Sequence, residues 1–181
     1  YTSDTSVTPP SVKFKRTRKY SPKVLVWIAV SEKGVSEPFF AQQRQAINET
    51  IYLKQCVNER LMPFIEDHHV IDKVLFWPDL ASSHYAGSVM EFFEENNIDL
   101  VPREANPQNC PQARPVETMW RILEEGVYGG GWEAETIDQL EQRITQQLKK
   151  LDMKPVQAMF SSISKQVRKI ADQGPYGACS F

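Results

Sequence analysis

Apolar residues occur along the chain both in short continuous runs and at helical spacing, which predicts strands and helices in alternation. The runs 23–30 (KVLVWIAV) and 35–41 (VSEPFFA) flank the turn-like stretch 31–34, so they predict a β-hairpin. Pro38 places the second of these strands at a sheet edge or a bulge, because proline donates no hydrogen bond to a β-ladder. Two further short strands are predicted at 73–77 (KVLFW) and 98–101.

Helical spacing predicts five helices around these strands. The first begins after Asn48, a favoured helix cap, and Pro63 should kink or break its last turns. The others are predicted at about 82–96, 115–128, 134–151 and 155–172, and the glycines 129–131 end the third. The expected apolar positions of the first two helices are Ile51, Tyr52, Cys56, Leu61, Phe64 and Ile65, and then Val89, Met90, Phe92 and Phe93. The order of elements predicts an α/β fold with a mixed sheet flanked by helices.

Composition limits the class of protein without identifying it. The 181 residues are 41% hydrophobic and 24% charged, which is typical of one globular domain. No apolar run is long enough for a membrane span, so we expect no membrane association. The first ten residues do not resemble a signal peptide, and the chain reads as a part of a longer protein. The three scattered cysteines predict neither a disulfide framework nor a zinc site, which favours an intracellular protein.

Positive charge is concentrated near the start of the chain. The basic segment 13–23 (KFKRTRKYSPK) carries Lys13, Lys15, Arg16, Arg18, Lys19 and Lys23. Such a segment can bind the phosphate backbone of a nucleic acid, or it can be a solvated edge protected by lysines. Charge alone leaves both interpretations open.

Candidate chemistry is limited to a pair of acids. The chain has no phosphate-binding loop, dinucleotide motif or zinc-protease motif, the glycines 129–131 are typical of a linker, and 66–69 (EDHH) is typical of a solvated helix end. Asp79 follows the predicted strand 73–77, and Glu117 lies in the first turn of the predicted helix 115–128. Asp79 can lie in a Pro-Asp turn as a helix cap, and Glu117 can complement a helix dipole. If the two carboxylates meet, hard divalent cations such as Mg²⁺ would relieve their repulsion.

Several stretches, in order, resemble mariner-type DNA transposases. The stretch 79–84 (DLASSH) is similar to the family's Asp-Asn-Ala-x-Pro-His, and 114–120 (RPVETMW) is similar to its Asn-Pro-Ile-Glu-x-x-Trp. The stretches 23–34 (KVLVWIAVSEKG) and 61–65 (LMPFI) resemble pieces of the family's hairpin and first core helix. The resemblance covers about residues 23–128.

The resemblance implies an RNase H-like catalytic core with a DDE/D carboxylate set that acts on DNA through two Mg²⁺ or Mn²⁺ ions. Asp79 and Glu117 would be catalytic metal ligands, one for each ion. His84 would lie beside the metal ligands or a phosphate, or would be a helix-surface histidine packed on Tyr85, and Trp120 would be a core residue rather than a DNA-stacking one. The basic segment would contact DNA. Double-stranded DNA as partner, a homodimer in the full-length protein and a nuclear location follow as expectations.

The departures from the family pattern set the limits of this prediction. Leu80 and Ser83 replace the family's Asn and Pro, and the loop before Glu117 is longer than the commonest form. No predicted strand within 1–22 ends in an aspartate, and Asp4 lies on no strand, so the first strand and first catalytic aspartate are expected to be missing.

We therefore predict the C-terminal part of a transposase that is inactive by itself in DNA cleavage and strand transfer. Its parts would be a polar, basic segment 1–22, an incomplete catalytic core 23–128, C-terminal helices 129–173 and a loose tail 174–181. The alternatives are a non-catalytic DNA-binding or assembly module derived from a transposase and an unrelated α/β interaction domain.

Overall fold

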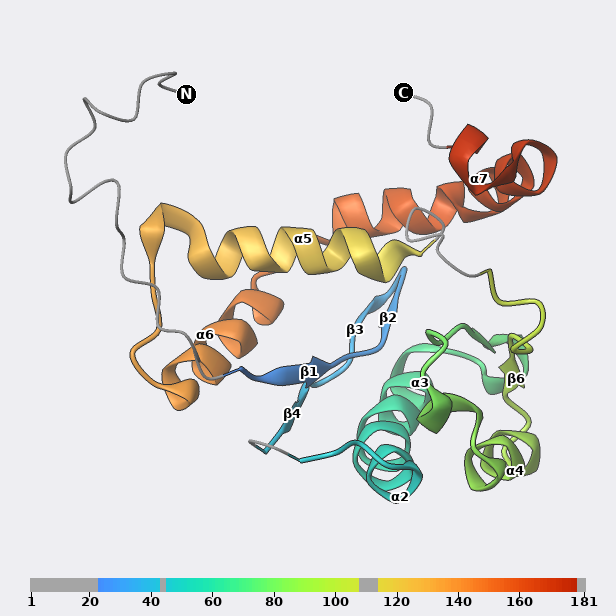
Figure 1. Cartoon of the computed structure of the whole chain (residues 1–181), viewed down its shortest axis with the longest axis horizontal. Coiled ribbons are helices and arrows are strands. Elements are labelled where there is room, and N and C mark those ends of the chain that lie inside the picture. Colours follow the sequence, from blue (N-terminus) through green and yellow to red (C-terminus); the bar gives the residue numbers. More distant parts are fainter. Residues whose placement is uncertain (1–22, 43–44, 108–113, 179–181) are drawn as a thin grey trace, which may run out of the picture.

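The computed structural model describes residues 23–42, 45–107 and 114–178, with the side chains of 175–178 left aside. Of the basic segment, residues 13–22 lie outside this part of the chain, and the described Lys23 is exposed. The strands of the hairpin within 25–41 lie between two groups of helices (Figure 1). No described helix has the length and apolar character needed to cross a membrane.

The predicted hairpin is present and is interrupted by a bulge. Strand β1 (Leu25–Trp27) pairs antiparallel with β4 (Phe39–Ala41), and β2 (Val30–Ser31) pairs with β3 (Gly34–Val35). Between the two ladders, the Ala29 N–H donates to Ser36 Oγ at 2.8 Å while the Ser36 N–H donates to Ala29 O at 2.9 Å. Pro38 lies in this interruption, as predicted, because a proline there removes no ladder hydrogen bond.

The first helical region contains an unusual winding. The short helix α2 (Glu49–Ile51) is capped by Asn48, whose Oδ1 accepts from the Ile51 N–H at 2.9 Å. It continues as a π-helix, η2 (Tyr52–Leu61), and then as α3 (Met62–His68). The π-type bond from Met62 N–H to Val57 O is followed by Pro63, which has no N–H to extend the series. Pro63 thus marks a change of winding, and the helix does not break there.

The next segment alternates short turns, strands and one helix. The turn η3 (Ile71–Lys73) leads into β5 (Leu75–Phe76), and the turn η4 (Ser82–Tyr85) leads into α4 (Gly87–Glu95). The prediction of a continuous helix over 82–96 is therefore wrong, because Ala86 has extended backbone angles (φ −69°, ψ 151°). Asn97 ends α4 in the left-handed conformation (φ 54°), and the Ile98 N–H donates to Phe93 O at 2.9 Å. This C-terminal cap turns the chain into β6 (Asp99–Leu100), which pairs parallel with β5.

Helices form the rest of the described chain. Helix α5 (Pro115–Tyr128) has the predicted bounds and ends at the turn η6 (Gly129–Gly131). Gly130 and Gly131 have φ values of 71° and 76°, which side chains rarely allow. Helices α6 (Ile137–Lys149) and α7 (Met153–Ala178) follow, with a kink in α7 at Gly174.

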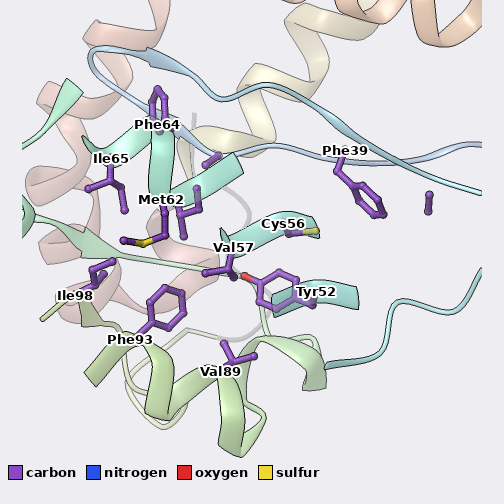
Figure 2. Packing of buried hydrophobic residues seen from close by; sticks show 13 residues of the cluster. Phe39, Tyr52, Cys56, Val57, Met62, Phe64, Ile65, Val89, Phe93 and Ile98 are labelled. Carbon is purple, nitrogen blue, oxygen red and sulfur yellow. The ribbon is translucent and has the colours of Figure 1, made fainter. Parts of the chain in front are cut away.

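Two hydrophobic clusters lie on opposite faces of the β1–β4 ladder. Trp27 and Phe39 contact the first cluster, whereas Val26 and Phe40 contact the second. Figure 2 shows the first cluster, which joins η2 and α3 to α4. Its buried members are Ala29, Phe39, Ala41, Tyr52, Cys56, Val57, Leu61, Met62, Phe64, Ile65, Val89, Phe93 and Ile98. The second cluster lies under α5 and α6, with Leu123, Val127 and Ile144 buried and Val24, Val26, Phe40, Trp120, Trp132, Leu140 and Leu148 partly buried.

The predicted mixed pairing is present in separate pieces. Within the described residues, β1 bonds to β4, β2 bonds to β3, and β5 bonds to β6, so parallel and antiparallel pairs do not form one continuous ladder. The helices lie around these short ladders as predicted, and the separation leaves the β1–β4 and β5–β6 pairs held together mainly by side-chain packing in the first cluster.

Candidate functional site

Asp79 lies just beyond the end of β5, after Trp77 and Pro78. Its Oδ1 accepts a hydrogen bond from the Ala81 N–H at 2.8 Å, which closes a short turn. Asp79 therefore lies in a turn, as one of the two interpretations predicted. Its side chain is also 60% exposed, so the carboxylate is both held by its own turn and open to a ligand.

Glu117 lies in the first turn of α5, as predicted. Arg114 is the residue before the helix, Pro115 begins it, and the Glu117 N–H donates to Arg114 O at 3.1 Å. The side chain of Glu117 is exposed. A carboxylate at this place complements the positive end of the helix dipole and remains available to a cation.

A buried asparagine joins the two segments that carry these acids. Asn106, which is 3% exposed, donates from Nδ2 to Pro78 O at 2.9 Å and to Tyr85 Oη at 2.7 Å. Its Oδ1 accepts from Trp77 Nε1 and from Arg114 Nη2, both at 2.9 Å. The peptide that precedes Asp79 and the residue that precedes α5 are thus bonded to one side chain. Pairing of the Asp79 and Glu117 carboxylates themselves stays a prediction.

His84 lies beside Asp79 in the interior of the protein. It is 9% exposed, its Nδ1 is 3.6 Å from Asp79 Oδ1, and its ring stacks on Tyr52 with centroids 4.5 Å apart. The alternative prediction, a helix-surface histidine packed on Tyr85, is therefore wrong. Burial lowers the pKa of His84, and the nearby Asp79 carboxylate partly opposes this, so the imidazole is neutral at pH 7.

Burial also shifts the pKa of two other side chains in this region. It raises the pKa of Tyr52, an effect increased by Cys56 and by the Asp79 carboxylate. Burial raises the pKa of the Cys56 thiol to about 12, with the Arg60 guanidinium acting in the opposite direction. Both side chains are therefore neutral at pH 7.

The capacity of the site for a metal follows from its oxygen donors. Asp79 and Glu117 offer the carboxylate oxygens that Mg²⁺ and Mn²⁺ prefer. Within the described residues, however, no three side chains of His, Cys, Asp or Glu are placed to hold one ion together. The donor type fits a hard divalent cation, and the described ligand set is incomplete.

Other residues singled out in the sequence have structural surroundings. At the end of α3, His69 Nε2 is 2.9 Å from Ser31 Oγ, and the Lys33 ammonium donates to His68 O at 2.6 Å. These contacts fix the 66–69 stretch to the hairpin turn, in agreement with a helix end. Trp120 packs against the second cluster and is a core residue, as predicted.

No protein-family model matches the chain, but a curated relative does. The chain is 26% identical over 147 residues to the Tc3 transposase of Caenorhabditis elegans. The match covers 81% of this chain and 43% of that protein, so the chain spans less than half the length of this relative.

The solved structures identify the fold. The chain superimposes on the Mos1 mariner transposase in its paired-end complex with Mn with a TM-score of 0.76 at 15% identity, over 97% of this chain and 51% of that one. It matches the catalytic domain of the same transposase with a TM-score of 0.68 at 16% identity, over 86% of this chain and 76% of that domain. The chain therefore has the fold of the Mos1 transposase catalytic domain, which is RNase H-like. With the Tc3 match, this confirms the resemblance to mariner-type transposases predicted from the sequence.

Asn106 is the residue that the sequence interpretation missed. It lies in the Pro-rich loop 102–115, and its partners Trp77, Tyr85 and Arg114 come from three other places in the chain. The available signal was indirect: the loop is long, and two aromatic residues with polar tips flank Asp79. A buried Trp N–H or Tyr O–H needs a hydrogen-bond partner, and the nearby loop carries a side-chain amide.

Proposed function

We propose that the chain is the catalytic-domain portion of a mariner-type DNA transposase, with Asp79 and Glu117 as ligands of divalent metal ions. The observation that carries the proposal is the placement of both acids on a transposase catalytic fold. Asp79 follows β5, Glu117 begins α5, and Asn106 bonds to the chain beside each. The class of reaction is metal-dependent strand cleavage and strand transfer of duplex DNA.

The residues of the chain have distinct tasks in this proposal. Asp79 and Glu117 would hold Mg²⁺ or Mn²⁺, and His84 would remain neutral beside Asp79 without competing for the ion as a cation. When bound, two such ions would supply an activated water or DNA hydroxyl and stabilisation of the leaving oxygen. The matched Mos1 structures include complexes with Mn and with a left transposon end, which supports metal and DNA as ligands of this chain.

The experiment that tests the site is a Mn²⁺ titration followed by electron paramagnetic resonance. Asp79→Asn and Glu117→Gln should each weaken Mn²⁺ binding. Glu124→Gln is the matched control, because Glu124 is an exposed acid on the same helix α5 and should leave binding unchanged. Unchanged binding in both Asp79→Asn and Glu117→Gln would contradict the proposal.

A second candidate is a non-catalytic DNA-binding or assembly module. The specific observation in its favour is that the described residues form no three-ligand metal group. We expect the 181-residue chain alone not to nick a labelled duplex in Mg²⁺ or Mn²⁺. Robust nicking that is lost in Glu117→Gln would contradict this expectation and reject the non-catalytic module.

DNA contact by the basic segment is a separate part of the proposal. Each phosphate neutralised should contribute a slope of about −0.9 to the log–log dependence of affinity on salt. Replacing Lys15, Arg16 and Arg18 by Ala should flatten this slope and weaken binding to all duplex sequences alike. Selective loss of one sequence would indicate base recognition instead. A nuclear location and a homodimer in the full-length protein accompany this function, and the paired-end complexes of Mos1 support the latter.

A further inference from the structure

We infer that Asn106 is a positioning residue that fixes the approach of the Asp79 and Glu117 segments to a shared metal site. The inference rests on the proposed function for its metal, and on the hydrogen bonds of Asn106 for its geometry. Among the described residues, the four hydrogen bonds of Asn106 go to Trp77, Pro78, Tyr85 and Arg114, and none goes to either carboxylate. It acts through the peptide before Asp79 and through Arg114, the residue before α5.

The hydrogen-bonding capacity of Asn106 is completely used. An asparagine amide has two N–H donors and an oxygen with two lone pairs. Nδ2 donates to Pro78 O and Tyr85 Oη, and Oδ1 accepts from Trp77 Nε1 and Arg114 Nη2. No other uncharged side chain of this size supplies two donors and two acceptor sites in a planar arrangement. At 3% exposure, solvent cannot replace a lost partner without rearrangement.

These bonds join elements that the backbone does not join. Trp77 and Pro78 leave β5, Tyr85 ends η4, and Arg114 precedes α5. The Tyr85 hydroxyl also donates to Val101 O at 3.2 Å, which adds the exit of β6 to the same network. Arg114 Nη2 additionally donates to Pro107 O at 3.2 Å, so the loop near Asn106 is bonded to α5 as well.

The network sets the position of both acids from their backbone side. Asp79 is bonded on one side through the Pro78 carbonyl and on the other through its own turn to Ala81. Glu117 is carried by a helix whose preceding residue is bonded to Asn106. Exposed carboxylates gain affinity for a metal when their backbones are fixed, because less conformational freedom is lost on binding. Mg²⁺ in particular requires nearly ideal ligand geometry.

The test compares variants that remove different parts of the network. Asn106→Asp keeps acceptors for Trp77 and Arg114 but removes the donation to Pro78 O. Trp77→Phe keeps the ring in place and removes one donor to Asn106, so it tests the network without changing Asn106. Asn96→Asp is the control, because Asn96 donates from Nδ2 to Phe92 O at 2.8 Å at the end of α4, outside this network.

Two measurements separate positioning from simple loss of stability. Hydrogen exchange of the Ala81 amide, which bonds Asp79 Oδ1, should accelerate in Asn106→Asp and Trp77→Phe and not in Asn96→Asp. Mn²⁺ affinity should fall by roughly 10–100-fold in Asn106→Asp, as for other residues that orient metal ligands. It should remain unchanged in Asn96→Asp. Circular dichroism establishes that each variant is folded.

The outcomes distinguish this inference from the proposed function. If Asp79→Asn leaves Mn²⁺ binding intact, the proposed metal site fails, while the exchange of Ala81 still reports on positioning by Asn106. If Asp79→Asn weakens binding but folded Asn106→Asp binds Mn²⁺ as the unmodified chain does, the inference is overturned and the metal site stands. Unchanged Ala81 exchange in both network variants would likewise overturn it.

Discussion

The two hydrophobic clusters differ in depth, and the candidate site draws one acid from each side. The first cluster has fully buried aromatic and aliphatic residues such as Tyr52, Val89 and Phe93, and Asp79 lies beside it through His84. The second cluster is shallower, since most of its described members are only partly buried, and its helix α5 carries Glu117. The proposed site would thus take one acid from beside a deep core and the other from a helix over a shallow core. Substitutions can therefore destabilise either hydrophobic cluster separately.

The largest effect is expected from the first cluster. Phe93→Ala should reduce the free energy of unfolding by about 3–5 kcal/mol, because Phe93 is 2% exposed and packs against Phe76 and Phe92. Urea unfolding followed by circular dichroism measures this loss. Met90→Ala on the same helix is the control: Met90 is 41% exposed, so the change should stay within about 0.5 kcal/mol. Equal losses in the two variants would contradict the assignment of the deep core.

A smaller effect is expected from the second cluster. Leu123→Ala should cost about 2–3 kcal/mol, at the lower end for such a truncation, because its partly buried neighbours can relax into the space. The same urea titration applies, with Glu124→Ala as an exposed control on α5. If Leu123→Ala lost more free energy of unfolding than Phe93→Ala, the second cluster would contribute more to stability than the first, contrary to this expectation.

The two helix caps should each contribute about 1 kcal/mol to stability. Asn48 caps the first helical region, and Thr136 Oγ1 accepts from the Gln139 N–H at 3.2 Å at the start of α6. Asn48→Ala and Thr136→Ala should each cost about 1 kcal/mol. Asn48→Asp and Thr136→Ser keep the cap oxygen and should recover most of the loss. If they do not, the side-chain oxygens are not the source of the stabilisation.

The smallest effect is expected from His69, where the hairpin turn meets α3. Burial lowers the pKa of His69, with Lys33 and His68 acting in the same direction and Glu32 opposing them. The unfolded chain therefore binds a proton at higher pH than the folded chain does. This contribution to stability is complete above about pH 6.5, the ordinary pKa of histidine, and is lost as the pH falls.

Unfolding titrations between pH 7.5 and 5.5 measure this dependence. His69→Gln should flatten it while keeping a side chain that can bond Ser31 Oγ, the partner of His69 in the structure. An unchanged pH dependence in His69→Gln would assign the effect to another group.

Local patterns predicted the elements that local physics controls. Helix α5 has the predicted bounds because Pro115 begins it and glycines end it. The hairpin and the break at Pro38 follow from strand-forming residues and from a missing N–H donor. These features depend on residues close together in the sequence, so one sequence was enough to predict them.

Features that depend on distant partners were missed or wrong. Val57 is fully buried in the first cluster but was absent from the predicted apolar face. His84 stacks on Tyr52, across the first cluster, and not on its neighbour Tyr85. Asn106 gave only an indirect signal, since its role comes from partners on other elements. Asp79 and Glu117 were identified by their places at element ends and by family resemblance.

The thiol of Cys56 gives a means to time the opening of the first cluster. Its side chain is fully buried in the first cluster, and burial raises its pKa to about 12. Alkylating reagents should therefore reach a reactive thiolate only when the cluster opens. The rate of modification at Cys56, followed by peptide mass mapping, then reports how often the first cluster opens. A destabilising substitution in the second cluster should leave the modification rate of Cys56 nearly unchanged if the two clusters open independently. It should raise that rate if they open as one unit.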